Sequence, residues 1–414
     1  MKRISLIMIL LLVSAALFAN GAKTGTKGEL VLAHGKPEID GAIKAYAAAW
    51  AEENGVKVTI KTCGGGNCDL GQMLKADYAA GEMPDIFAVN GKEDFLEWEA
   101  LAANLSGEPW VEHTDMAFEH KGKTFGFPVS LEGFGIAYNA DILAEAGVDP
   151  KSLVNLSGYR EAFAKIDSMK EELGLDSVVS MAAGPEMFWV VAHHNINSLL
   201  SNGLPYGDTS VADELIAGKV DAQRLSEYAD WVELLFQYAD KAILTVGNYD
   251  AQVGAFATEK AAFLHQGNWT DPNLATANAT FKMAFAPHGS MEAATDGIFI
   301  SAPSFYLVND NSVNADLAKK FLNDLVLSQA GANYMVTEAQ MITAFGNIDL
   351  RPDGQLSSSV QDWKSEDKMY SWNQYLLTAE LRDKTLAPIY NQFANEQIDK
   401  AEFIRLMTET FESQ

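Results

Sequence analysis

Short apolar runs alternate with amphipathic stretches in the first part of the chain. The runs are 28–33, 56–62 and 85–89. Each is too short for a buried helix and is typical of a buried strand. Helical spacing lies between them: one helix opens at Pro37, and the next follows Asp69 and Gln72, which resemble a capping box. This order predicts a parallel, doubly wound sheet. Ligands of such sheets bind beyond the carboxyl ends of the strands, here at 34–38, 63–69 and Asn90.

The remainder of the chain is richer in helical spacing. Helices are predicted at 140–146, 159–173, 222–238 and 315–327, the last with Asn314 as its cap, and strands at 261–269, 297–303 and 305–308. The polar segment 355–367 is interpreted as a linker or a surface helix, and 367–411 as a helical tail. A length of 414 residues suits one large domain or two ordinary ones.

The amino terminus has the pattern of a secretory signal peptide. Lys2 and Arg3 precede a mostly apolar run, 4–18, and small residues follow at 19–22. We therefore expect residues 1–21 to be removed. No cysteine follows the apolar run, so the usual lipid anchor of a lipoprotein has no attachment point, and a free periplasmic protein is expected.

The net charge of the chain limits the kinds of partner that we expect it to bind. Loss of Lys2 and Arg3 takes the formal net charge from −26 to −28, which disfavours nucleic acid and anionic lipid as partners.

Cys63 and Cys68 enclose a glycine-rich loop. In an exported protein this pair predicts a disulfide, with two free thiols as the alternative.

Four motifs in sequence order carry a resemblance to a known family. They are PDIF at 84–87, GKTFGFP at 122–128, EGFGIAYN at 132–139 and DILAEAGV at 141–148. This series, with ADLAKKFL at 315–322, resembles the family 1 extracellular solute-binding proteins, the sugar-binding subunits of ABC importers. The resemblance implies a monomeric carbohydrate-binding protein that delivers its ligand to permease subunits in the inner membrane. It implies no catalysis, no cofactor and no metal.

The same resemblance implies an α/β fold of two lobes, each a sheet flanked by helices, with several hinge crossings. We expect crossings near 128–132, 300–303 and 355. The N-lobe would then comprise 27–131 and 300–355, and the C-lobe 132–299 and 356–414.

Candidate ligand residues follow from the resemblance and from sugar chemistry. A sugar needs a flat aromatic face for its C–H groups and planar polar groups for its hydroxyls. The resemblance assigns stacking to Trp269, a place in the cleft to Glu132, and a second-lobe aromatic to Phe188 or Trp189. The further candidates are Gln266, Asn268, Trp372, Asn90, Glu38 and Asp85.

Each candidate also has a structural interpretation. The aromatic residues can be core residues, Glu132 can make a structural hydrogen bond, and Asp85 can satisfy backbone N–H groups at a strand start. Two other functions stay open. A polyamine binder of the same fold would use Asp85, Glu132 and Glu38 to hold ammonium groups. A secreted glycosidase, which would need a carboxylate pair, is less favoured because no motif supports it.

Overall fold

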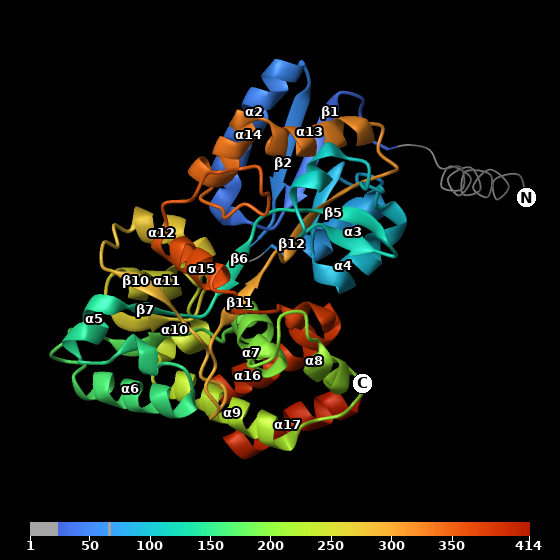
Figure 1. Cartoon of the computed structure of the whole chain (residues 1–414). Helices are drawn as coiled ribbons and strands as arrows, with labels where there is room; N and C mark the ends of the chain where they lie inside the picture. The colour runs from blue at the N-terminus through green and yellow to red at the C-terminus, as the bar shows by residue number, and fades with distance from the viewer. Residues whose placement is uncertain (1–23, 65–67) are drawn as a thin grey trace, which may run out of the picture.

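Three sheets organise the residues that this computed structural model describes, 24–64 and 68–414. The predicted signal peptide lies outside these residues. The first sheet has six strands in the order β2-β1-β3-β12-β5-β4 and forms the N-lobe (Figure 1). Its strands are β1 (Glu29–His34), β2 (Lys57–Thr62), β3 (Ile86–Asn90), β4 (Phe118–His120), β5 (Lys123–Pro128) and β12 (Ser304–Val308).

The first three strands of the N-lobe are parallel, as predicted. The complete sheet is mixed, because β12 returns from the far end of the sequence and pairs antiparallel with both β3 and β5. Helices pack on the sheet, and their buried aromatic residues meet: the rings of Trp50 and Phe321 lie 5.0 Å apart. These helices are α2 (Asp40–Asn54), α3 (Leu70–Ala80), α4 (Gly91–Trp98), α13 (Ala315–Leu327) and α14 (Gln329–Asn333).

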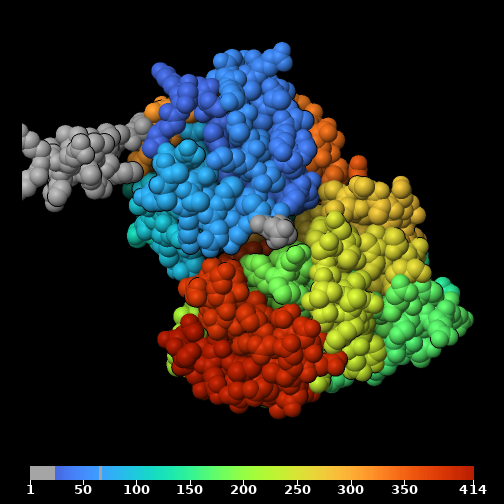
Figure 2. Space-filling view, turned by 180° about the vertical axis from the view of Figure 1, so that it is seen from behind, coloured from blue at the N-terminus to red at the C-terminus, as the bar shows by residue number. Residues whose placement is uncertain are grey.

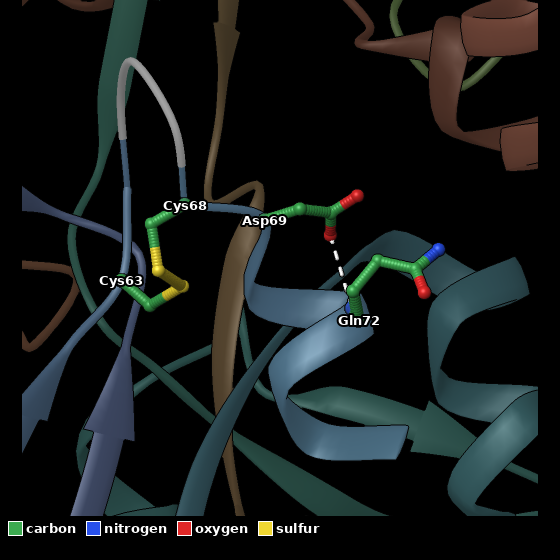
Figure 3. The surroundings of a disulfide bond; sticks show 4 residues. All are labelled: Cys63, Cys68, Asp69 and Gln72. Atoms are coloured by element: carbon green, nitrogen blue, oxygen red, sulfur yellow. Dashed lines mark hydrogen bonds between the residues drawn. A yellow bond between two sulfur atoms is a disulfide. The ribbon is translucent and has the colours of Figure 1, made fainter. Parts of the chain in front are cut away.

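The predicted disulfide is present between β2 and α3 (Figure 3). Cys63 and Cys68 are bonded, with 5.1 Å between their Cα atoms. Asp69 then caps α3, because the backbone N–H of Gln72 donates to its carboxylate at 3.1 Å. The bond holds the carboxyl end of β2 beside the start of α3.

Asn314 occupies the N-cap position of α13, as predicted, but its side chain makes no capping hydrogen bond to the helix. Its side chain instead forms hydrogen bonds with the backbone of residues 26–29, near the start of the described chain. The Gly28 N–H donates to its Oδ1 at 2.9 Å, and its Nδ2 donates to the carbonyls of Thr26 and Glu29 at 3.0 and 2.9 Å. A long-range contact has therefore replaced the local one.

The C-lobe is built on a four-stranded sheet in the order β10-β7-β9-β8. Its strands are β7 (Ile136–Asn139), β8 (Ser177–Ser180), β9 (Ala261–Leu264) and β10 (Met283–Ala286). Tyr159, Phe163, Trp231 and Phe263 form the centre of its core. The covering helices are α5 (Ala140–Glu145), α6 (Leu156–Ser168), α7 (Ile196–Ser201), α8 (Ser210–Ile216), α9 (Ala222–Gln237), α10 (Lys241–Val246), α11 (Tyr249–Ala257), α12 (Asp271–Thr276), α16 (Ala387–Ala394) and α17 (Lys400–Glu412).

A three-stranded sheet, β13-β11-β6, lies where the chain passes between the lobes (Figure 1). It contains β6 (Glu132–Phe134), β11 (Ile298–Ser301) and β13 (Met369–Tyr370). An isolated bridge between Leu131 and Ile342 adds a further segment beside β6. Figure 2 shows the blue and cyan N-lobe meeting the green, yellow and red C-lobe along a waist.

For the carboxyl-terminal part, the helix alternative for segment 355–367 is confirmed, and the expectation of a continuous helical tail needs correction. The segment predicted as a linker or surface helix is α15 (Gln355–Ser365), which packs across the crossing strands through buried Leu356 and Val360. The predicted helical tail begins with strand β13 and the 3₁₀ helix η9 (Asn373–Leu376), and helix follows only from 380. Within the described residues, no helix is both long enough and apolar enough to cross a bilayer.

Candidate functional site

A small cavity lies between the two lobes at the crossing strands. The N-lobe supplies Lys36 and Glu38, the crossing supplies Ser130 and Glu132, and the C-lobe supplies Asn268 and Trp269. Its volume is about 20 Å³, which is room for about one water molecule. The space between the lobes at this point is therefore narrow, with polar and aromatic walls.

Lys36 pairs with two carboxylates in this cavity. Its ammonium donates to Glu132 Oε1 and lies 3.5 Å from Glu38 Oε1. Burial opposes the charge on Lys36, but attraction by Glu132 and Glu38 outweighs it and raises the pKa of the ammonium. For Glu38, burial is the largest influence and raises the pKa despite the nearby ammonium. Ser130 Oγ donates to the same Glu132 oxygen at 2.9 Å.

Trp269 lies just beyond the carboxyl end of β9, where the 3₁₀ helix η7 (Asn268–Thr270) starts. The ring is half-buried and packs over Gly267, where a β-carbon would come within 2.1 Å of it. Its Nε1–H donates to Gln266 Oε1 at 3.0 Å, and Gln266 Nε2 donates to Gln252 Oε1 at 2.7 Å. A glycine and two buried amides thus fix the indole in the cavity wall.

The two amides predicted to bind ligand are engaged within the protein. Gln266 bonds Trp269, as above. Asn268 accepts from the Gly133 N–H at 2.9 Å and donates to Ser357 Oγ at 3.1 Å, although it also lines the cavity. Both residues therefore position the walls of the site.

Trp372 belongs to an aromatic cluster beside this cavity, with Phe134, Phe299 and Tyr370. Its ring lies 6.2 Å from that of Trp269. The side chain is buried, and its indole N–H has no protein partner among the described residues. Trp372 also lines a second cavity of about 150 Å³, where Asn373, Tyr375 and Leu376 of the C-lobe face Gly91 and Lys92 of the N-lobe.

Phe188 and Trp189 are half-buried and lie behind these walls. The ring of Phe188 packs 5.6 Å from that of His193, and the ring of Trp189 packs 5.3 Å from that of His194. His194 in turn contacts Trp269, with 4.8 Å between the ring centroids. Neither predicted aromatic is among the residues lining the two cavities described above.

Asn90 and Asp85 mark opposite ends of β3. Asn90, at the carboxyl end, accepts from Ser304 Oγ at 2.6 Å and precedes Gly91 of the second cavity. Asp85, at the other end, is buried and accepts from the Val31 N–H at 2.6 Å and from Ser312 Oγ. The structural interpretation of Asp85 fits these contacts, and the ligand interpretation does not.

The sequence reasoning missed Lys36, Ser130 and Tyr375. Lys36 lies in the 34–38 segment that was expected to face the cleft, so its position was available, but a lysine after a strand is ordinarily solvent-exposed. No sequence signal distinguished Tyr375. Across 24–64 and 68–414, no group of three or more His, Cys, Asp or Glu side chains is arranged to hold a metal ion.

Two lobes that meet over a polar and aromatic cavity define a ligand-binding protein of the periplasmic binding protein fold. A profile of the bacterial extracellular solute-binding proteins matches residues 45–365, and the chain belongs to that family. The members of this family are transport proteins that bind solutes and do not act as enzymes.

Named relatives of this chain bind sugars. The multiple sugar-binding protein of Streptococcus mutans is 24% identical over 390 residues, which are 87% of this chain and 88% of that protein. The melibiose/raffinose/stachyose-binding protein MelE of Bacillus subtilis is 21% identical over 74% of this chain and 71% of its own length.

Solved structures share the fold. RafE in complex with raffinose has a TM-score of 0.76 at 15% identity, over 93% of this chain and 99% of RafE. A Bacillus licheniformis sugar transporter in complex with stachyose has a TM-score of 0.74 at 17% identity, over 92% and 98% of the two chains.

Proposed function

We propose that this protein captures a neutral oligosaccharide in the cleft between its lobes and presents it to the permease of an ABC importer. The observation that carries the proposal is the composition of the first cavity. It places the carboxylate of Glu132, the ammonium of Lys36 and the indole of Trp269 around one space. Carboxylate and ammonium can bond sugar hydroxyls, and an indole face can cover the C–H face of a ring.

The second cavity supports a ligand of more than one ring. Trp269 lines the first cavity and Trp372 lines the second, their ring centroids lie 6.2 Å apart, and both cavities include residues from both lobes. The buried indole N–H of Trp372 has no hydrogen-bond partner among the described residues. The sugars named for the relatives, raffinose and stachyose among them, agree with an oligosaccharide.

Closure of the lobes is the proposed means of capture. We place the N-lobe at 27–131 and 300–355 and the C-lobe at 132–299 and 356–414, and the membership of the sheets supports this division. A ligand that touches Lys36 and Trp269 makes contacts with both lobes, which only the closed state provides. Binding would then favour closure by differential affinity. The permease would recognise the closed pair of lobes in the periplasm.

A ligand screen tests the proposal. Purified protein is heated with raffinose, stachyose, maltooligosaccharides or chitin oligosaccharides, and hits are titrated by calorimetry. A bound ligand raises the melting temperature by mass action. Spermidine and an aryl glycoside are included as probes of the polyamine and glycosidase alternatives. Binding of spermidine with no response to any sugar, or turnover of the glycoside, would overturn the proposal.

A further inference from the structure

Two carboxylates and one ammonium meet at the wall of the first cavity. Lys36 precedes the 3₁₀ helix η1 (Pro37–Ile39), which contains Glu38, and Glu132 begins β6. The side chains of Lys36, Glu38 and Glu132 are only 15%, 17% and 9% exposed. The group is therefore withdrawn from water but open to whatever enters the cavity.

The ammonium of Lys36 occupies the place that a cationic ligand would take. Buried carboxylates need a counter-charge, since leaving them unpaired is costly. Lys36 supplies that charge from within the chain, through its contacts to Glu132 and Glu38. Among the described residues that line the cavity, Lys36 is the only cation, and Ser130, Trp269 and Met341 are uncharged.

We propose that Lys36 determines the ligand charge that this cleft accepts. It is a tethered cation that neutralises Glu132 and Glu38 and so excludes organic amines while leaving the site open to neutral ligands. The proposal refines the proposed sugar site, but the exclusion of amines is a separate property that can be measured without a sugar.

Replacement of the lysine by a free amine provides the test. Lys36→Ala removes three methylene groups and the ammonium, which together correspond to n-propylammonium. We expect the variant to bind n-propylammonium and putrescine roughly tenfold or more tightly than the wild-type protein, as expected when a close charge pair is re-formed. The amines should also raise its melting temperature. Thermal shift and calorimetry measure both effects.

Matched variants separate charge from other effects. Lys44→Ala removes an exposed lysine that is paired with Asp40 at 2.8 Å, and it should gain no amine binding. Lys36→Arg keeps the charge and should still exclude amines. Lys36→Ala/Glu132→Gln removes the carboxylate as well and should lose most of the acquired amine binding.

Two results of the amine-binding measurements would contradict the proposed role of Lys36. Wild-type protein that binds putrescine as tightly as Lys36→Ala, or a folded Lys36→Ala that binds no amine, would overturn the proposal. If Lys36→Ala does not fold alone, n-propylammonium should restore folding, and failure to do so also counts against it. An absence of sugar binding by wild-type protein would refute the proposed function but would leave this comparison intact.

Discussion

Trp269→Ala is the substitution that most directly examines the site. The indole is half-buried, with Phe134 and His194 packed around it and its remaining surface in the cavity wall. Its N–H is occupied by Gln266, so the ring face is what it offers to a ligand. Truncation removes this face and leaves the backbone at Gly267 in place.

The expected loss follows from the apolar area that a stacked sugar covers. Burial of an aromatic face against the C–H groups of one ring contributes about 1 to 3 kcal/mol. Since each 1.4 kcal/mol is a factor of ten, affinity should fall roughly tenfold to a hundredfold. A fully buried tryptophan would cost about 3 to 5 kcal/mol of folding stability on truncation. Trp269 is only half-buried, so we expect a smaller loss and a drop of only a few degrees in melting temperature.

Calorimetric titration and melting of the ligand-free variant measure the two quantities separately. Trp363→Ala is the matched control, because Trp363 is also half-buried but donates its N–H to the Phe285 carbonyl outside both cavities. It should lose stability and keep its affinity. Trp269→Phe keeps an aromatic face without the N–H and should bind within a few-fold of wild type. A Trp269→Ala protein that melts much lower but binds sugar normally would identify Trp269 as a core residue and refute the reasoning.

Four further outcomes are expected. Unreduced, denatured protein should contain no alkylatable thiol at Cys63 or Cys68, and replacing both by serine should cost about 2 kcal/mol of stability, the low value for a short loop. Asp85→Ala should cost about 2 to 4 kcal/mol by leaving buried donors unsatisfied, with ligand affinity unchanged in titrations. Burial lowers the pKa of His34 from 6.5 to about 4. Between these two pH values the unfolded chain binds a proton at His34 that the folded chain does not, so the free energy of unfolding should fall as the pH drops from 6.5 toward 4. His34→Gln should reduce the loss of stability between pH 7 and pH 5, measured by denaturant titration at each pH. Saturating sugar should lower the radius of gyration in small-angle scattering, and an unchanged radius with binding confirmed would exclude closure.

Local signals in the sequence were sufficient for many elements of the fold. Pro37, Asp69 and the apolar spacing placed the first helices to within a few residues, and 315–327 coincides with α13. Such signals depend on neighbours within a turn or two of the helix, which a sequence displays directly. The disulfide was also predictable because its two cysteines are close in sequence.

Features that depend on distant partners were not predictable in this way. Nothing near β12 indicates that it inserts antiparallel between β3 and β5. Asn314 has the local properties of a helix cap, but its partners lie more than 280 positions away. For the site, the resemblance pointed to Trp269 and Glu132, while the pairing of Lys36 with Glu132 joins residues 96 positions apart.

The narrowness of the first cavity links recognition to motion. A space of about 20 Å³ cannot hold a sugar ring, so the lobes must part or Lys36 must turn aside before a ligand enters. Glu132 lies on a crossing strand, and its partner Lys36 belongs to the N-lobe, so separating them costs free energy at the hinge. Because of that cost, only a fraction of the molecules is competent to bind at any time, and the apparent affinity is the intrinsic affinity multiplied by that fraction. A ligand recovers this cost only by replacing the lost contacts on both lobes at once, and this requirement favours ligands with several hydroxyls over small solutes with few.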